Sequence, residues 1–353
     1  MQARRILVTG GAGFIGSNLI RFLLRETEAF IVNVDKLCYA GSAATIDDIQ
    51  QSPKHRFEQM DICAALEIGK LIEDVKPDAI FHLAAESHVD RSIDSPNPFM
   101  QTNIMGTYVL LEAARRYWRK LSQLSQQRFR FIHVSTDEVF GSLEQGDQPF
   151  TEVNPYCPSS PYSASKAAAD HLSHAWCRTY KLPVIITNCS NNYGPFQYPE
   201  KFIPLMITRA IQGRELPLYG NGRNIRDWIF VEDHARALRE VLHRGRVGER
   251  YNVGGQSEKT NMEVVYMICG MLDEIAPHNA PHKRLIRFVE DRPGHDYRYA
   301  LDIGKISSEL GWHPVEAFAS GLRKTVQWYL DNDRWCRDVI GDYYQGQRLG
   351  LSH

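Results

Sequence analysis

The chain has 353 residues, of which 43% are hydrophobic and 24% charged, and its formal net charge is −1 at pH 7. A chain of this length can bury a large core, and its near-zero charge gives no general attraction for a polyanion such as nucleic acid. It contains no run of about 18 apolar residues that would span a membrane. We therefore expect a globular cytoplasmic protein with no nucleic-acid or membrane partner.

Cysteine and histidine usage argues against disulfides and metals. The seven cysteines form no C-x-x-C pair and their number is odd, which disfavours a disulfide framework and fits a reducing compartment. His171 and His174 are spaced as helix neighbours, but no acidic or cysteine partner stands beside them. We expect no metal site.

The N-terminal stretch predicts a dinucleotide-binding unit. Residues 4–9 predict a buried strand, residues 10–16 a glycine turn, residues 17–25 a helix, and residues 31–34 a second strand that ends at Asp35. Such a turn lets backbone N–H groups approach a pyrophosphate at the helix N-terminus, and Asp35 stands 19 residues after Gly16 (35 − 16), where an acid binds the ribose 2′-hydroxyl. A carboxylate there would repel a 2′-phosphate, so the pattern favours NAD over NADP. The alternative is a glycine-rich turn in another kind of α/β domain.

Strands and helices then alternate up to about residue 189. Apolar runs at 57–62, 79–85, 131–134 and 183–187 predict strands, and residues 66–75, 98–118 and a segment from Tyr162 predict helices. Residues 119–129 read as a polar surface connection. This alternation predicts an α/β fold with a Rossmann-type, doubly wound parallel sheet that binds ligands at the carboxyl ends of its strands.

The stretch from Ser135 to Lys166 concentrates the ionisable chemistry. Asp137 and Glu138 follow one predicted strand, and Tyr162 and Lys166 stand four residues apart, on one face of a helix. A lysine cation beside a phenol should lower the phenol's pKa from about 10, as a proton-transferring tyrosine requires. The alternatives are that the tyrosine packs on the lysine stem and that one of the acids caps the next segment.

After residue 189 the alternation loosens, which predicts a smaller, partly discontinuous C-terminal lobe. Its scattered arginine, lysine and asparagine residues suit a sugar diphosphate, although each alone also fits a surface salt bridge or turn. Helices are expected near 303–310 and 315–332. We expect an NAD-binding domain of residues 1–189 plus about 229–256, and a nucleotide-sugar-binding domain of residues 190–228 and 257–353.

Seven motifs, spread over nearly the whole chain, carry a family resemblance. They are TGGAGFIG (9–16), LAAESHVD (83–90), STDEVFG (135–141), YSASK (162–166), NNYGP (191–195), RDW (226–228) and DRPGHD (291–296). Together they resemble the extended short-chain dehydrogenase/reductase family, and within it the nucleotide-sugar 4,6-dehydratases. The Thr-Asp-Glu triplet is the most specific, because epimerases of the family usually lack this acid pair. Phe140 and Tyr297 depart from the tyrosine and arginine that are common at these positions.

The resemblance implies a lyase that converts dTDP-glucose to its 4-keto-6-deoxy derivative. Tyr162, helped by Lys166, would remove the proton of the carbon-4 hydroxyl while NAD takes the hydride. Glu138 would then take the carbon-5 proton, Asp137 would protonate the departing carbon-6 hydroxyl, and Thr136 would hold the sugar. Because elimination needs one acid and one base, the two neighbouring carboxyl groups should differ in protonation.

The resemblance also implies binding residues and a homodimer, paired through the helix near 100–118 and the helix that starts at Tyr162. The implied cofactor-binding residues are Gly10, Gly13, Phe14, Ile15, Gly16, Asp35, Lys36, Leu37, Asp61, Ile62, Leu83, Ala84, Ala85, Ser87, Thr102, Tyr162, Lys166 and Asn192. The implied substrate-binding residues are Ser87, Thr136, Asn191, Lys201, Phe202, Pro217, Tyr219, Arg226, Asn261, Asp291, Arg292, His295 and Tyr299.

Three alternative functions stay open at this point. The substrate could be UDP- or CDP-glucose, because composition does not distinguish the bases. A nucleotide-sugar 4-epimerase would use the same tyrosine and lysine without the acid pair. A non-catalytic NAD-binding sensor would need neither the tyrosine–lysine pair nor the acid pair.

Overall fold

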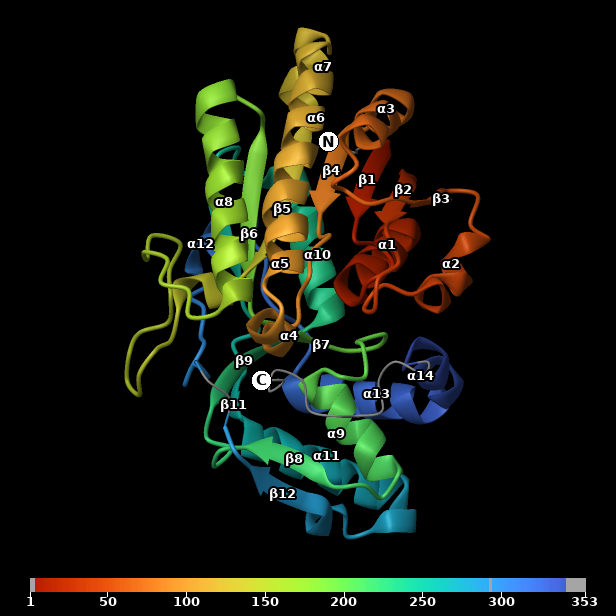
Figure 1. The fold of residues 1–353 in the computed structure, drawn as a ribbon, viewed down its shortest axis with the longest axis vertical. Coiled ribbons are helices and arrows are strands. Elements are labelled where there is room, and N and C mark those ends of the chain that lie inside the picture. The colour runs from red at the N-terminus through yellow and green to blue at the C-terminus, as the bar shows by residue number, and fades with distance from the viewer. Residues whose placement is uncertain (1–3, 292–293, 341–353) are drawn as a thin grey trace.

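The apolar runs of the N-terminal half pair as a seven-stranded parallel sheet in the computed structural model, which describes residues 4–291 and 294–340 (Figure 1). The strand order is β10-β6-β5-β4-β1-β2-β3. Strands β2 and β3 are therefore added on one side of β1, and β4, β5 and β6 on the other side. The strands are β1 (Arg5–Thr9), β2 (Phe30–Asp35), β3 (His55–Gln59), β4 (Ala79–His82), β5 (Arg130–Thr136), β6 (Val184–Cys189) and β10 (Arg250–Val253).

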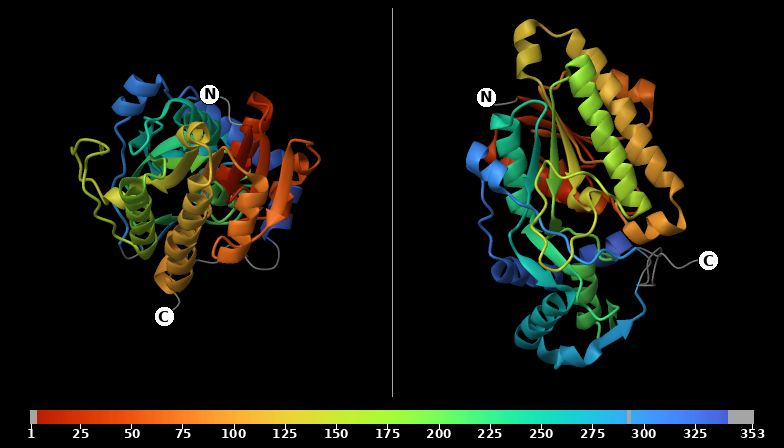
Figure 2. Two further views of the ribbon diagram at one scale, coloured as in Figure 1. Left: turned by 90° about the horizontal axis from the view of Figure 1, so that it is seen from above. Right: turned by 90° about the vertical axis from the view of Figure 1, so that its left-hand side faces the viewer.

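Helices cover both faces of this sheet, which explains why its central strands are almost continuously hydrophobic. One face packs against α1 (Phe14–Glu26), α10 (Val231–Arg244) and α12 (Gly304–Leu310), and the other against α3 (Ala65–Val75), α6 (Thr107–Arg119) and α8 (Pro161–Tyr180). Figure 2 shows α6 and α8 side by side on the outside of the second face. The predicted fold class is confirmed.

The second lobe, at the bottom of Figure 1, has its own hydrophobic core. It contains a three-stranded sheet in the order β11-β9-β7 and the parallel pair β8 and β12. Its elements are β7 (Asn191–Tyr193), α9 (Phe202–Ile211), β8 (Leu216–Tyr219), β9 (Ile225–Phe230), β11 (Glu258–Thr260), α11 (Asn261–Ile275), β12 (Ile286–Val289), α13 (Phe318–Asp331) and α14 (Asp333–Ile340).

The chain passes between the two lobes more than once. It leaves the large sheet after β6, returns through α10 and β10, leaves again at β11, and returns in α12. Ile306, Leu310 and Trp312 belong to the core beneath the large sheet. We therefore propose the predicted division into domains with residues 303–312 assigned to the NAD-binding lobe.

Two predicted elements differ from the structure. The segment 119–129 is not only a connection, because residues Gln123–Arg128 form α7, capped by Ser122, whose hydroxyl accepts from the N–H of Ser125. The expected helix over 98–118 consists of α5 (Asn97–Phe99), a π-helical stretch η2 (Met100–Gly106) and α6. Within the described ranges, no helix is long and apolar enough to cross a membrane.

Candidate active site

The glycine turn between β1 and α1 is shaped by close backbone contacts. Gly10 has a φ of +75°, and a Cβ there would lie 2.6 Å from the backbone nitrogen of Ala84. A Cβ on Gly16 would lie 2.2 Å from the carbonyl oxygen of Gly10, whereas one on Gly13 would meet only that oxygen, at 3.3 Å. The turn is therefore closed against the sheet and open above Gly13, as a pyrophosphate at the N-terminus of α1 requires.

Asp35 is held at the end of β2 by two backbone donors. The N–H of Ala12 lies 3.0 Å from Oδ2, and the N–H of Leu37 lies 2.9 Å from Oδ1. Burial raises the pKa of Asp35, and these two hydrogen bonds oppose that shift. The neighbouring Lys36 pairs with Glu86 at 3.0 Å, so its charge is already neutralised within the chain. Both features favour a ribose hydroxyl over a 2′-phosphate.

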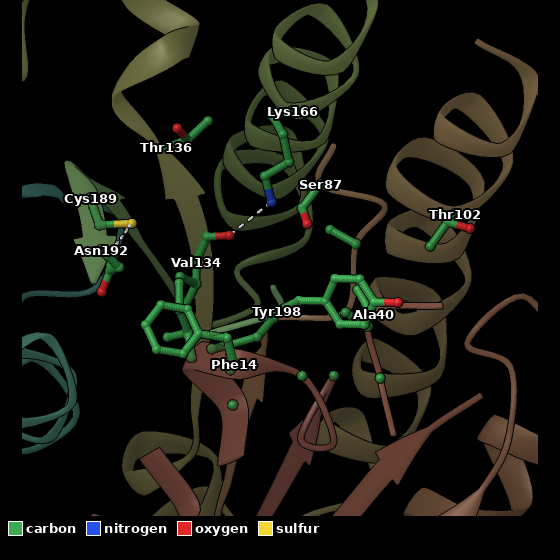
Figure 3. A pocket seen from close by; sticks show the side chains of 18 of the residues that line it. Phe14, Ala40, Ser87, Thr102, Val134, Thr136, Lys166, Cys189, Asn192 and Tyr198 are labelled. Atoms are coloured by element: carbon green, nitrogen blue, oxygen red, sulfur yellow. Dashed lines mark hydrogen bonds between the residues drawn. The ribbon is translucent and has the colours of Figure 1, made fainter. Parts of the chain in front are cut away.

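A cavity extends from this turn to the reactive residues at the ends of β5 and α8 (Figure 3). Most of the predicted cofactor residues and all of the predicted catalytic residues lie in its wall. The predicted residues that line it are Gly10, Gly13, Phe14, Ile15, Gly16, Asp35, Lys36, Ile62, Leu83, Ala84, Ala85, Ser87, Thr102, Thr136, Asp137, Glu138, Tyr162, Lys166, Asn191, Asn192 and Lys201.

The remaining predicted residues that the structure describes lie away from this cavity wall. Leu37 packs against the first core, and Asp61 accepts a 2.8 Å hydrogen bond from the N–H of Cys63. Arg292 lies outside the described residues. The others sit in the second lobe: Phe202, Pro217, Tyr219, Arg226, Asn261, Asp291, His295 and Tyr299.

Thr136 organises the two acids that follow it. Its hydroxyl donates to Oδ1 of Asp137 at 3.2 Å and accepts from the N–H of Glu138 at 3.3 Å. Thr136, not an acid, thus caps the short 3₁₀ helix η3 (Asp137–Phe140). Neither carboxyl group serves as the cap of η3.

The two carboxyl groups differ in environment. Asp137 is 2% exposed, and Glu138 is half-buried. Burial raises the pKa of Asp137 well above its usual value, and repulsion from Glu138 and Asp227 adds to this shift. Among the residues that the structure describes, Oδ2 of Asp137 has no hydrogen-bond partner. Asp137 is therefore suited to hold a proton and donate it to a ligand.

The start of helix α8 is fixed so that Tyr162 lies in its first turn. Pro161 occupies the first helical position, and Ser160 and Ser163 exchange hydrogen bonds in a capping box. Lys166 follows one turn later, and its ammonium donates to the carbonyl of Val134 at 2.8 Å (Figure 3). Tyr162 and Lys166 both line the cavity.

The predicted lowering of the Tyr162 pKa is wrong for this structure. Burial raises the pKa of this phenol well above 10, and the negative charge of Glu138 raises it further. Burial also lowers the pKa of Lys166, which Asp170 opposes. The helical spacing of Tyr162 and Lys166 shows neither that Tyr162 is buried nor that Glu138 lies near it.

In the second lobe, Arg226 and Tyr299 lie together near the acids. The guanidinium of Arg226 stands 4.4 Å from the centre of the Tyr299 ring and donates to the carbonyl of Asp296 at 3.0 Å. Burial raises the pKa of Tyr299, and the negative charge of Glu138 raises it further.

A second group of predicted substrate residues clusters around Tyr219. Its hydroxyl donates to Asp90 at 3.4 Å, and its ring meets the ring of His295 edge-on at 6.1 Å. His295 in turn contacts Asp291 at 2.6 Å. Tyr219 therefore joins the second lobe to α4 (Val89–Asp94), the short helix that follows β4.

Several cavity residues were not predicted from the sequence. Tyr198 reaches the cavity from the second lobe and meets Tyr39 edge-on at 5.8 Å (Figure 3). The sequence held a signal only for the loop after Asp35, because that loop directly follows the acid that is predicted to bind the ribose. The unpredicted lining residues are Val34, Cys38, Ala40, Gly41, Met60, Val134, Ser135, Cys189, Ser190, Gln197 and Tyr198.

Comparison with known proteins places this chain among sugar-nucleotide enzymes. The family model described as GDP-mannose 4,6 dehydratase matches residues 7–325. The chain belongs to this family. It is 58% identical to a dTDP-glucose 4,6-dehydratase of Neisseria meningitidis serogroup B over 98% of this chain and 99% of that one.

Solved structures support the same placement within the family. A dTDP-glucose 4,6-dehydratase of Bacillus anthracis in complex with NAD matches with a TM-score of 0.85 and 45% identity, over 96% of this chain and 100% of that one. A UDP-glucose 4-epimerase of Thermus thermophilus matches with a TM-score of 0.81 and 28% identity, over 93% and 99% of the two chains. The fold is thus shared with epimerases, while sequence similarity is greater to the dehydratases.

Proposed function

We propose that this chain is an NAD-dependent lyase that converts dTDP-glucose to dTDP-4-keto-6-deoxyglucose and water. The observation that carries the proposal is the pair Asp137 and Glu138, one buried with a raised pKa and one half-buried, in the wall of the cavity that also holds Tyr162. The high identity to dTDP-glucose 4,6-dehydratases supports the same reaction and the same nucleotide.

The residues of the cavity fit NAD. The glycine turn would admit the pyrophosphate to the N–H groups at the start of α1, and Asp35 would hold the adenosine ribose. When bound, NAD would supply a hydride acceptor for carbon 4 and a hydride donor for carbon 6, and the positive charge of its oxidised ring would favour a phenolate at Tyr162. Tyr39 and Tyr198 would cover the site from its outer side.

Tyr162 and Lys166 are proposed to remove the proton of the carbon-4 hydroxyl. The phenol of Tyr162 lies in the cavity wall, and Lys166 is fixed on the carbonyl of Val134. A fixed ammonium is suited to stabilise negative charge as the proton leaves the sugar. The product of this step is a ketone at carbon 4, which acidifies the hydrogen on carbon 5.

The acid pair is proposed to carry out the elimination. Glu138 takes the carbon-5 proton, the carbon–oxygen bond at carbon 6 breaks, and Asp137 gives its proton to the departing hydroxyl, which leaves as water. The hydroxyl of Thr136 keeps Oδ1 of Asp137 in place, which leaves Oδ2 for the substrate. Elimination thus uses the difference in protonation that burial creates.

The second lobe is proposed to bind the nucleotide and the diphosphate. Arg226 presents a guanidinium beside Tyr299, and such a group can bind phosphate through two parallel hydrogen bonds. Lys201, Asn191 and Ser87 line the adjoining cavity wall, where they would contact the sugar and its phosphate. The other second-lobe residues predicted from the resemblance keep this proposed role.

We also propose a homodimer that works in the cytoplasm. The adjacent outer faces of η2, α6 and α8 expose Met105, Tyr108 and Tyr180, which are 46%, 40% and 42% exposed. Apolar and aromatic groups gathered on two neighbouring helices are suited to pack against a second copy. The free state of all seven cysteines is consistent with a reducing compartment.

An assay of substrate and product tests this function. The protein is incubated separately with dTDP-, UDP-, CDP- and GDP-linked sugars in deuterated water, and the alkali-absorbing 4-keto product is measured. Fastest product formation from dTDP-glucose, with deuterium at carbon 5, is expected. Interconversion of 4-hydroxyl configuration without label at carbon 5 would identify a 4-epimerase and overturn the proposal.

A further inference from the structure

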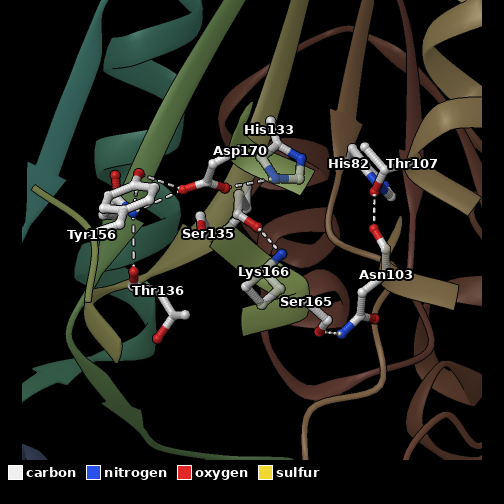
Figure 4. Close-up of polar contacts among 12 residues, drawn as sticks. His82, Asn103, Thr107, His133, Ser135, Thr136, Tyr156, Ser165, Lys166 and Asp170 are labelled. Carbon is white, nitrogen blue, oxygen red and sulfur yellow. Dashed lines mark hydrogen bonds and ion pairs between the residues drawn. The ribbon is translucent and has the colours of Figure 1, made fainter. Parts of the chain in front are cut away.

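A buried group of polar side chains, centred on Asp170, lies between α8 and the strands β5 and β6 (Figure 4). The carboxylate of Asp170 is 0% exposed, and it accepts a hydrogen bond from the hydroxyl of Tyr156 at 2.6 Å. Its other close partners are Nε2 of His133 at 3.0 Å and Nδ2 of Asn188 at 3.3 Å. Asp170 lines no part of the cavity, and the reaction proposed above does not use it.

The partners of Asp170 join three elements at the reactive end of the sheet. His133 belongs to β5, Asn188 to β6, and Asp170 itself to α8. Asn188 also donates to the carbonyl of Thr136 at 3.0 Å. The group therefore fixes β5 just before the segment that presents Asp137 and Glu138.

Asp170 follows Lys166 by one turn of α8, so both side chains project from the same helix face. The ammonium of Lys166 donates a hydrogen bond to the carbonyl of Val134 in β5. Asp170 contacts the same strand through the side chain of His133, one residue earlier. The two contacts together hold α8 on β5 in one register.

The ionisation states of Asp170, His133 and Lys166 are consistent with these contacts. Burial would raise the pKa of Asp170, but the hydrogen bond with His133 and the charge of Lys166 outweigh it and lower the pKa, so Asp170 is a carboxylate. Burial lowers the pKa of His133, which leaves the imidazole neutral near pH 7 with Nε2 as its donor toward Asp170. The neutralising cation for this buried carboxylate is then Lys166, and the charge of Asp170 in return opposes the lowering of the Lys166 pKa by burial.

We propose that Asp170 is a positioning residue for the reaction, which keeps the buried Lys166 charged and fixes the Thr136 end of β5 through His133 and Asn188. This role rests on the proposed function, because it acts through Lys166 and through the acid-bearing segment. A buried ammonium without a counter-charge would lose its proton at a lower pH. Hydride removal from carbon 4 would then fail at a pH where the native enzyme still works.

The test is the pH profile of the first step in Asp170→Asn, measured as reduced cofactor formed in a single turnover. The alkaline limit of this step is expected to move to lower pH by about one unit, because an opposing charge close to Lys166 is lost. The titratable side chains that face Asp170 or its partners are His133, Tyr156, Lys166, His82 and His171, and Arg250 adds a fixed charge over the Tyr156 ring.

Two variants separate charge from packing. Asp170→Glu keeps the charge and is expected to retain the native alkaline limit, even where its rate is lower. Tyr156→Phe removes one hydrogen bond and leaves the carboxylate, so its limit should also stay in place. An unshifted limit in Asp170→Asn would overturn the proposal. If that variant does not fold, Asp170→Ser, which removes the same charge, must show a shift in the same direction, and an unshifted limit there has the same meaning.

The native enzyme is assayed first with dTDP-glucose. Failure to form any 4-keto product would overturn the proposed function. In an active native enzyme, an unshifted Asp170→Asn profile overturns only the role of Asp170.

Discussion

The hydroxyl of Thr136 donates a hydrogen bond of 3.2 Å to Oδ1 of Asp137, the residue that follows it. The same oxygen accepts the N–H of Glu138, so one side chain orients both members of the acid pair. Because Oδ2 of Asp137 meets no partner among the described residues, the proton of this carboxyl can be directed to a bound sugar.

Asp137→Asn should stop elimination while leaving the first oxidation intact. An amide cannot donate the proton that the departing hydroxyl needs, and loss of such a general acid costs about 10²- to 10⁴-fold in rate. Reduced cofactor should therefore accumulate with dTDP-glucose, which is followed by its absorbance.

The same variant tests the pH dependence. Because burial raises the pKa of Asp137, its carboxyl stays protonated at low pH and loses its proton as pH rises through that raised value. The elimination rate of the native enzyme should fall over that rise, and the residual rate of Asp137→Asn should not. A matching alkaline fall in both proteins would show that another group is the acid.

Glu138→Gln should abolish proton exchange at carbon 5 and leave the bound NAD content unchanged. Glutamine keeps the size of the side chain but has no basic oxygen of comparable strength. Deuterium incorporation at carbon 5, measured by mass spectrometry, reports this step directly. Unchanged turnover would remove Glu138 from the mechanism.

Tyr162→Phe should prevent reduced cofactor from forming at all. The variant keeps the ring that packs edge-on against Phe99 at 6.3 Å, so the fold should be retained. Single-turnover absorbance distinguishes it from Asp137→Asn, which accumulates the reduced form. Normal formation of reduced cofactor would show that the first base is a different group.

Gly16→Ala should lose bound NAD and lower the thermal midpoint. Its new Cβ would lie 2.2 Å from the carbonyl of Gly10, so the turn has to open. Gly69→Ala is the control, because a Cβ there meets nothing within 4 Å and alanine is favoured inside a helix by about 1 kcal/mol. The control should keep NAD and raise the midpoint slightly; equal NAD retention in both variants would contradict the turn's role.

Tyr108→Lys should convert the proposed dimer to a monomer. The side chain is 40% exposed, so a charge there costs the folded monomer little but would be buried in an interface. Sedimentation of the native chain and the variant measures the outcome. The control is Val153→Lys, an exposed residue in the loop before α8, which should sediment like the native chain.

Local patterns predicted six of the seven strands of the large sheet, the glycine turn, and the positions of Asp35 and of the acid pair at the strand ends, but not strand β10. These features depend on residues that are close in the sequence. A buried parallel strand appears as a run of apolar residues, and the polar residues of each turn directly follow their strand. Helix α7 was missed because its polar sequence has no apolar face, and its support comes from Trp118, whose indole N–H donates to the carbonyl of Gln126.

Features that depend on distant contacts could not be predicted in this way. Tyr198 approaches the cofactor end of the cavity from the other lobe, and only the folded chain places it against Tyr39. The pKa of Tyr162 follows from burial and from Glu138, which helical spacing to Lys166 does not report. Asp170 belongs to the same class, because its partners come from separate strands and a loop.

The repeated passage of the chain between the lobes has a consequence for folding. Trp312 and its neighbours in α12 complete the core under the large sheet, although nearly 300 residues separate them from β1. A fragment that ends after β6 or β10 would expose this core to water, so we expect that the NAD-binding lobe cannot be isolated by such truncation. Unfolding should accordingly be a single cooperative event, and the nucleotide sites should appear only when the last third of the chain has been synthesised.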